Sequence, residues 1–351
     1  MPYCRKCGAK LDETARFCPA CGTPVAAFAA ATKPPAPERR PFYVLPVAIL
    51  IAVLGSALVI GALLFLPLYP VHFNQTNQVP EAEMDDLFLD FQVDVAQVNI
   101  FFENLPGNMA VLNVTADGSV GIFDDPNQAV NVTFSHQTTN NSVVVVASVF
   151  QAVKWSILHN VNVKCDVYID PSANLTVQVR SSTGNIVMDA DTEVTLKKID
   201  LETSTGNVDV SLSKGAVAAG FVSLKTTTGS VQFKMEKADI SGNVSVNLRS
   251  TTGSVNVDLA ATKLSGNATV NARTTTGSVN LHMAIENDVG ARIESDTDLG
   301  SIAVDVDRFS GDQSPIQSSN YPAGSNFLVN LRTTTGGINI NAAYGSSAVL
   351  N

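Results

Sequence analysis

The strongest constraint in this sequence is a short phrase that recurs between Ser181 and Ile340. Its copies read STGNI, STGNV, TTGSV, DLGSI and TTGGI, and most follow one another at similar spacing. A fixed period of this size indicates a chain built from structural repeats. The last step is longer than the others, so we expect an insertion there. The glycines at the centres of the copies are Gly184, Gly206, Gly229, Gly253, Gly277, Gly300 and Gly336.

The residues around each glycine alternate between apolar and polar. Around Gly253, for example, Val246, Val255 and Val257 are apolar, whereas Asn256 between the last two is polar. This period of two predicts half-buried strands, so each copy is interpreted as strand, tight Thr-Gly corner, strand. One such unit cannot bury its apolar face alone, but stacked copies can. We therefore predict a mainly β chain whose repeats form a single-chain β-solenoid of stacked two-strand rungs.

The corner predicts a specific backbone and side-chain arrangement. Glycine accepts a positive φ without the steric strain that other residues incur, so the chain can turn at every rung. Thr and Ser residues before it would form ladders of hydroxyls. These ladders either hold the corner or present a flat array to an ordered surface such as a glycan or ice. The exposed-array hypothesis involves Thr228, Thr252 and Thr276.

A charged residue stands four positions before each of the seven corner glycines. Because like charges on adjacent rungs repel each other mildly, a run of cations there suggests a role. Lys225, Arg249 and Arg273 form such a run, and it could bind an anionic glycan. The full set at this position is Arg180, Glu202, Lys225, Arg249, Arg273, Asp296 and Arg332.

Four cysteines near the N-terminus form two Cys-x-x-Cys pairs, each followed by glycine. Cys4, Cys7, Cys18 and Cys21 have the spacing that surrounds one structural Zn²⁺ with four thiolates. Two disulfides are the alternative. The stretch YCRKCGAKLDETARFCPACGTPV resembles the short zinc ribbons at the N-termini of many prokaryotic membrane proteins. Reduced thiolates need a reducing compartment, so residues 1–25 are expected to be cytoplasmic.

An uncharged apolar segment follows an Ala- and Pro-rich linker at 26–41. Phe42 to Leu68 exceeds the roughly 20 apolar residues that cross a bilayer, and we assign 42–69 as a transmembrane helix. A cleaved signal peptide is the alternative, although the run is long for one and lies after the cysteine motif. Arg39 and Arg40 precede the segment and acidic residues follow it, so the positive-inside rule places the N-terminus in the cytoplasm.

The remaining boundaries follow from composition and pattern. We expect a stalk at 70–84, an irregular β cap with leading rungs at 85–165, the solenoid at 166–345 and a tail at 346–351. Gln151 to His159 is a candidate short helix in the cap, and Cys165 is expected to be a buried small residue. The insertion at Arg308 to Asn326 is either a binding loop or a plain surface excursion.

The chemistry-bearing residues do not assemble into a catalytic site in the sequence. The formal net charge is −10 and the C-terminal part is acidic, which argues against nucleic acid as its partner. A nucleophile, base and orienting group cannot be assembled from the scattered histidines, so we expect no enzyme. The acids near the C-terminal end would either hold calcium or form a solvated edge; they are Asp296, Asp298, Asp305 and Asp307.

The TTGSV repeats also resemble the putative-adhesin family of bacterial and archaeal β-strand-repeat proteins over roughly Val161 to Ala342. The resemblance implies a membrane-anchored surface protein discussed as an adhesin or an envelope-stress component, and it supplies no catalytic residues. We therefore expect a single-pass protein of the cell membrane whose external solenoid contacts a surface glycan or protein. The alternatives are a signalling protein whose ribbon contacts a cytoplasmic partner, and a β-helix that binds or cleaves glycans.

Overall fold

The computed structural model describes residues 3–25, 44–64, 69–82, 86–121, 124–139, 142–152, 160–213, 216–260, 263–286, 288–311 and 314–345. The chain divides into two compact units, Met1–Phe65 and Leu66–Asn351, and each is described by itself. The expected linker at 26–41, the tail at 346–351 and most of the candidate helix at Gln151 to His159 lie outside the described residues.

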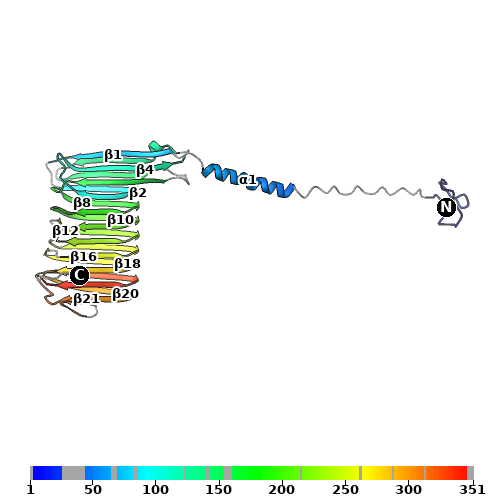
Figure 1. The fold of residues 1–351 in the computed structure, drawn as a ribbon. Helices are drawn as coiled ribbons and strands as arrows, with labels where there is room; N and C mark the ends of the chain where they lie inside the picture. The colour runs from blue at the N-terminus through cyan, green and yellow to red at the C-terminus, as the bar shows by residue number, and fades with distance from the viewer. Residues whose placement is uncertain are drawn as a thin grey trace. The chain divides into compact units, whose positions relative to one another are not determined.

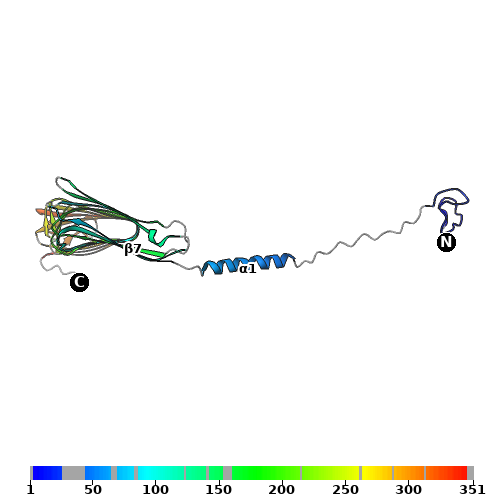
Figure 2. The same ribbon diagram turned by 90° about the horizontal axis from the view of Figure 1, so that it is seen from above.

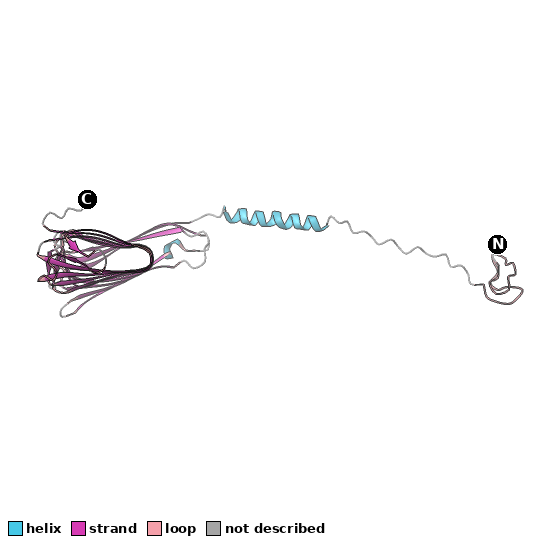
Figure 3. Ribbon diagram, turned by 90° about the horizontal axis from the view of Figure 1, so that it is seen from below, coloured by secondary structure: helices cyan, strands magenta, loops and turns pink. Residues whose placement is uncertain are grey.

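The first unit holds the cysteine cluster and one helix. Two isolated β-bridges, Tyr3 to Lys10 and Phe17 to Pro24, close the two cysteine knuckles. Helix α1 (Val44–Leu64) is the long cyan helix in Figure 3 and carries no charged residue. Its side chains from Pro46 to Val59 are exposed. In the part of the chain that the structure describes, no helix satisfies both the length and the hydropathy required to cross a membrane.

The second unit consists of two extended sheets, which have 11 and 14 strands in the described residues. Each repeat places one strand in the 14-stranded sheet, turns at the Thr-Gly corner and places the next strand in the 11-stranded sheet (Figures 1 and 2). Neighbouring repeats pair in parallel in both sheets, for example β12 with β15 and β13 with β16. In spatial order, the strand pairs are β6 (Val143–Gln151) and β7 (Asn160–Ile169), β2 (Asp86–Val95) and β3 (Gln97–Phe102), β8 (Asn174–Thr183) and β9 (Ile186–Ala190), β10 (Val194–Thr205) and β11 (Val208–Leu212), β12 (Ala216–Thr228) and β13 (Val231–Glu236), β15 (Val244–Thr252) and β16 (Val255–Ala260), β18 (Asn267–Thr276) and β19 (Val279–Ile285), β24 (Ser325–Thr335) and β25 (Ile338–Tyr344), and β20 (Val289–Leu299) and β21 (Ile302–Asp307).

The corner glycines form one row, as the sequence predicts. Gly253 has a φ of +137°, and a Cβ added to it would lie 2.0 Å from the carbonyl oxygen of Gly229 on the neighbouring strand pair. No side chain fits there, because the strain of this φ and the approach of the neighbouring backbone both exclude it. The row runs Gly184, Gly206, Gly229, Gly253, Gly277, Gly336, Gly300.

Apolar side chains between the two sheets form a continuous core. The valine or isoleucine two residues after the glycine is fully buried in six consecutive strand pairs. Phe91, Phe233 and Phe327 add large buried side chains at other positions of the core. The strands pair in register, so equivalent residues of neighbouring strand pairs lie beside each other. Each set of equivalent apolar side chains therefore forms a continuous column through the core. The six residues are Ile186, Val208, Val231, Val255, Val279 and Ile338.

The order of the strand pairs departs from the sequence at both ends. The last pair in the sequence, β24 and β25, lies between β18–β19 and β20–β21. The first pair, β2 and β3, lies between β6–β7 and β8–β9. Two-strand segments that follow one another in the sequence are therefore not always neighbours in the stack, at either end. Most inward positions are apolar in every repeat, so the repeat phrase itself does not determine which repeats become neighbours.

Antiparallel strands cover the N-terminal end of the stack, and one of them replaces the expected stalk. β1 (Tyr69–Pro80) pairs along its length with β4 (Asn108–Val120), which in turn pairs with β7. The prediction of a stalk at 70–84 is wrong because the inward positions of β1 include Gln75 and Asn77, which break the apolar alternation. A hydrogen bond of 3.1 Å between these two amides satisfies part of their polarity. β5 (Val130–Thr138) follows the short 3-10 helix η1 (Pro126–Gln128) and pairs with β6.

The insertion before Gly336 covers part of the other end. It contains β22 (Phe309–Ser310) and β23 (Ile316–Ser318), and β23 pairs antiparallel with β20. The Ile316 side chain is fully buried, so this segment is a cap rather than a plain excursion. β21 lies at the edge of the 11-stranded sheet, and its first residue, Ile302, is exposed, as is Leu299 at the end of β20. Two short strands, β14 (Asp239–Ser241) and β17 (Lys263–Ser265), extend the return loops.

Candidate functional site

The four N-terminal cysteines converge as their spacing predicts. Cys4 Sγ lies 3.6 Å from Cys21 Sγ, Cys7 Sγ lies 3.6 Å from Cys18 Sγ, and all four sulfurs lie within 4.8 Å of one another. A tetrahedral zinc ion with Zn–S bonds of about 2.3 Å separates its sulfurs by about 3.8 Å. The four thiols therefore fit one such ion. The disulfide alternative is wrong, because all four cysteines are free.

The two halves of the cluster are built alike. The amide of Gly8 donates to the Cys4 carbonyl, and the amide of Gly22 donates to the Cys18 carbonyl, each at 2.8 Å. Both glycines have a positive φ, which lets the chain turn back under the sulfurs. Leu11 is buried beside Cys4 and Cys18. With so small an apolar core, a bound metal has to supply most of the folding free energy.

Hydrogen bonds prepare two of the thiols for ionisation. The hydroxyl and the amide of Thr23 lower the pKa of Cys21 to about 6, and the Thr23 hydroxyl lies 3.2 Å from Cys21 Sγ. Backbone amides of Lys6 and Cys7 lower the pKa of Cys4. At Cys7 the Ala9 amide acts in the same sense, but the neighbouring thiols outweigh it and raise the pKa to about 12. The thiolate is the form that binds zinc.

A second group of functional candidates lies on the outer face of the 14-stranded sheet. The strand register places Lys225 beside Arg249, and Arg249 beside Arg273, as predicted. The next residue in this column is Arg332 rather than Asp296, because β24 lies between β18 and β20. Four cations therefore occupy consecutive strands, one more than the sequence order predicts.

Columns of neutral polar side chains flank these cations. On one side, Asn271 Nδ2 donates to Asn247 Oδ1 at 3.0 Å, and Asn330 Nδ2 donates to Asn271 Oδ1 at 2.9 Å. On the other side lie exposed threonine hydroxyls. We call this surface the basic strip; it comprises Lys225, Arg249, Arg273, Arg332, Asn247, Asn271, Asn330, Thr227, Thr251, Thr275 and Thr334.

Carboxylates bound the basic strip at both ends. On β10, Asp200 and Glu202 precede it, and on β20, Glu294, Asp296 and Asp298 follow it. Arg332 lies 3.5 Å from Asp296 and 3.8 Å from Asp298, so its charge is partly balanced. Among the described residues, no carboxylate comes within 4.0 Å of the other three cations, Lys225, Arg249 and Arg273.

The threonines before the glycines divide into an inner and an outer set. Inner hydroxyls are buried and donate to a glycine carbonyl of the neighbouring strand pair: Thr226 to Gly206, Ser250 to Gly229, and Thr274 to Gly253, each at 2.8 Å. This set holds the corner. The outer set, including Thr228, Thr252 and Thr276, is exposed at the corner itself. Sequence alone could not separate the two sets.

The acids near the C-terminal end do not gather into one site. Asp296 and Asp298 pair with Arg332, whereas Asp305 and Asp307 lie on β21 in the other sheet. Among the described residues, only the four cysteines come close enough together to hold a metal ion. The calcium hypothesis therefore gains no support from this arrangement.

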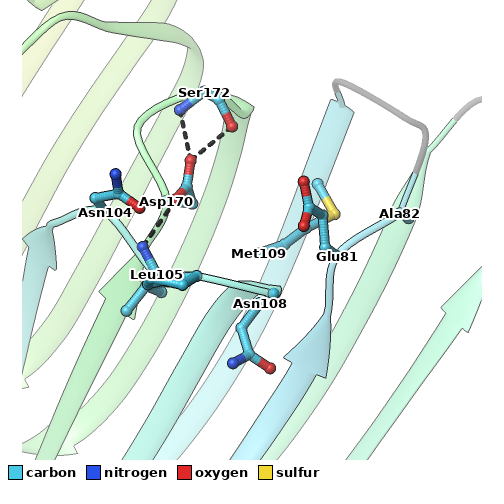
Figure 4. A pocket seen from close by; sticks show the side chains of 10 residues that line it. Glu81, Ala82, Asn104, Leu105, Asn108, Met109, Asp170 and Ser172 are labelled. Carbon is cyan, nitrogen blue, oxygen red and sulfur yellow. Dashed lines mark hydrogen bonds between the residues drawn. The ribbon is translucent and has the colours of Figure 1, made fainter.

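A hollow of about 300 Å³, which no sequence motif indicates, lies beside the loop that precedes β4 (Figure 4). One of its lining residues, Asp170, accepts hydrogen bonds from the Leu105 amide and from the amide and hydroxyl of Ser172. Partial burial opposes ionisation of Asp170, but these hydrogen bonds outweigh it and lower the pKa. The carboxylate is thus engaged in holding two turns together.

Cys165 is fully buried and free, as the sequence predicts. Burial raises the pKa of its thiol to about 12, so it packs as a small apolar side chain.

Comparisons with known proteins identify the N-terminal motif. Residues 3–25 match the zinc-ribbon domain. No curated protein matches the chain in sequence. Solved structures to which the chain is similar include a putative cell adhesion protein from Clostridium sporogenes, at 13% identity and a TM-score of 0.42, with 77% of this chain and 99% of that chain covered.

Two further structures of this kind are putative adhesins. The one from Bacteroides fragilis has 12% identity and a TM-score of 0.30, with 77% of this chain and 97% of that chain covered. The one from Parabacteroides merdae has 10% identity and a TM-score of 0.27, with 77% and 95% covered. At these TM-scores the likeness carries no argument about what this chain does.

Proposed function

We propose that this chain is a non-enzymatic, single-pass membrane protein whose second unit lies outside the cell and makes adhesive or envelope contacts. In this proposal the second unit is a β-solenoid, and the first carries a cytoplasmic ribbon with one structural zinc ion. The observation that carries the proposal is the long, regular outer face of the 14-stranded sheet. It presents repeated polar groups at a fixed spacing of about 4.8 Å, which suits contact with an extended surface.

Membrane anchoring rests on the segment Phe42 to Leu68. It contains no charged residue, and both its ends lie outside the described residues. The apolar side chains of α1 are exposed all round, a pattern that is stable in an apolar medium rather than in water. Arg39 and Arg40 before the segment favour a cytoplasmic N-terminus.

That the chain is not an enzyme is part of this proposal, and it draws on the surroundings of three described histidines. His136 lies beside the Phe134 ring, with ring centroids 6.2 Å apart. His72 pairs with Asp117 on the exposed face of β1, and His282 lies 3.3 Å from Asp258 on the face of β19. Among the described residues, no serine or cysteine side chain is hydrogen-bonded to either of these two histidine–aspartate pairs. Adhesive or envelope contact requires no such catalytic group.

Protease treatment of intact cells tests the topology. We expect the second unit to be degraded and the ribbon to be protected, as detected by antibodies to tags at each end. Protection of the second unit together with degradation of the ribbon would reverse the orientation. Cells lacking the chain should then lose attachment to the surfaces to which wild-type cells adhere.

A signalling role, in which the ribbon binds a cytoplasmic partner, is favoured by the exposure of two aromatic rings on the ribbon. Tyr3 and Phe17 are 63% and 62% exposed, although rings of this size contribute strongly to protein interfaces. A cytoplasmic partner would cover them if the chain signals contact to the interior. Crosslinking of wild type and the Y3S/F17S variant distinguishes the two roles. A signalling protein should lose a crosslinked partner in the variant, whereas a passive anchor should give the same crosslinks in both.

A further inference from the structure

We propose that the basic strip binds a linear polysaccharide that carries carboxylate or sulfate groups. This inference rests on the proposed contact role and names its ligand class. The chain has a formal net charge of −10, so a run of four cations on consecutive strands is contrary to its overall composition. Such a run is mildly unfavourable in the free protein, because adjacent like charges repel each other.

The geometry of the strip fits an extended polymer better than a small ligand. Its cations lie on adjacent parallel strands about 4.8 Å apart, so the column from Lys225 to Arg332 spans about 14 Å across the strands. Side chains at alternate positions along one strand are about 7 Å apart, which places the asparagine and threonine columns on either side of the cations. A chain lying across the strands would therefore contact cations in its middle and hydroxyl or amide groups at both edges.

The chemistry of the strip selects an anionic glycan. Guanidinium groups bind carboxylates and sulfate-like oxyanions through paired hydrogen bonds, and two of the unpaired cations are Arg249 and Arg273. Threonine hydroxyls and asparagine amides match the hydroxyls of sugars. Proteins that bind single-stranded nucleic acids stack the bases on aromatic side chains, and no position of the strip is aromatic.

The carboxylates at both ends define the extent of the site. Asp200 and Glu202 on one side, and Glu294, Asp296 and Asp298 on the other, would repel a polyanion that slid beyond the four strands. The last of the four cations is in place only because β24 is inserted before β20. The crossed order at this end of the stack therefore completes the strip.

Binding of the full-length chain in liposomes to coated surfaces tests the proposal. The surfaces carry heparin as a sulfated glycan, polygalacturonate as a carboxylated glycan, dextran as a neutral glycan, or single-stranded DNA. We expect binding to one or both anionic glycans, little to dextran, and weakening as the salt concentration rises. Which anionic glycan binds better identifies the charged group.

The decisive variant is R249S/R273S, and R180S/R292S is its control because it removes two charges from the same sheet outside the strip. We expect R249S/R273S to weaken binding roughly tenfold or more and the control to leave it nearly unchanged. The R249K/R273K variant should retain most of the binding, and melting temperatures of all variants confirm that they fold.

Equal losses in both double variants, binding to neither anionic glycan, or equally tight binding of DNA would overturn the proposal. These failures differ from failure of the contact role. If deletion of the chain abolishes attachment of cells but R249S/R273S attaches normally, the strip assignment is wrong and the contact role stands. If deletion changes nothing, the contact role is wrong as well.

Discussion

The two units of this chain acquire their stability from different sources. In the ribbon, the buried apolar cluster consists of two cysteines and Leu11, within the residues described there. In the second unit, apolar columns continue through consecutive strand pairs. The comparison teaches that a short motif can rely on a metal ion, whereas a repeat can rely on copies of itself. Perturbing either source should leave the other unit intact.

The largest expected effect is on the ribbon. A zinc chelator, or Cys18→Ser, should unfold it, because metal binding supplies about 10 kcal/mol or more of folding free energy in such motifs. Trypsin cleavage of the full-length chain at Lys10 and Arg16 reports this unfolding. Cys165→Ser, which alters a buried cysteine of the second unit, should leave the ribbon resistant. A ribbon that stays resistant in chelator would contradict the metal requirement.

The next effect concerns the core of the second unit. Phe233→Ala should lower its free energy of unfolding by about 3–5 kcal/mol, because the Phe233 side chain is fully buried. Phe221→Ala is the matched control, since Phe221 is 39% exposed, and should change it by less than about 1 kcal/mol. Urea unfolding of the full-length chain measures both. Similar losses of unfolding free energy in the two variants would indicate that the buried apolar columns are not the main source of stability.

The glycine row should be almost as sensitive. Gly253→Ala combines an unfavourable φ with a clash against the Gly229 carbonyl, and we expect a loss of about 3 kcal/mol. Gly242→Ala is the control: Gly242 also has a positive φ, +76°, but nothing lies within 4 Å of an added Cβ. Its expected loss is about 1 kcal/mol. The difference between the two variants isolates the close contact between strand pairs.

A smaller effect separates the inner hydroxyls from the outer ones. Ser250→Ala removes the 2.8 Å hydrogen bond to the Gly229 carbonyl and should lower stability by about 1 kcal/mol. Thr251→Ala alters an exposed neighbour and should have little effect. Denaturant midpoints of the two variants provide the comparison. Identical midpoints would show that the inner hydroxyls do not stabilise the corner.

The smallest effect depends on pH. Lys197 Nζ at 2.6 Å and Asn174 Nδ2 at 3.0 Å lower the pKa of Asp86. A folded pKa below the unfolded value of about 3.9 stabilises the fold above that pH, and the contribution is lost as the pH falls further. The melting temperature of Asp86→Asn should therefore fall less than that of wild type when the pH is lowered from about 5 to about 3. An unchanged pH profile would show that this contact adds no stability.

The repeat units were predictable because the Thr-Gly corner and the apolar alternation are local signals. The order of the units was not, because inward residues of all repeats are alike and no local signal assigns neighbours. Arg332 therefore joined the cations unexpectedly. The strand β1 was missed because Gln75 and Asn77 interrupt its inward face. The cysteine cluster was fully predictable, since its spacing alone determines the ligand set.

The crossed order at the two ends determines how such a chain could change in length. The segments β2–β3 and β24–β25, the first and last strand pairs in the sequence, are each held between two others, so each is locked in place from both sides. Duplication of a middle segment would lengthen the molecule without disturbing either lock. Duplication of β15–β16, which carries Arg249, would also add one cation to the basic strip. In the proposed role, a longer stack of this kind would bind an anionic polymer more tightly.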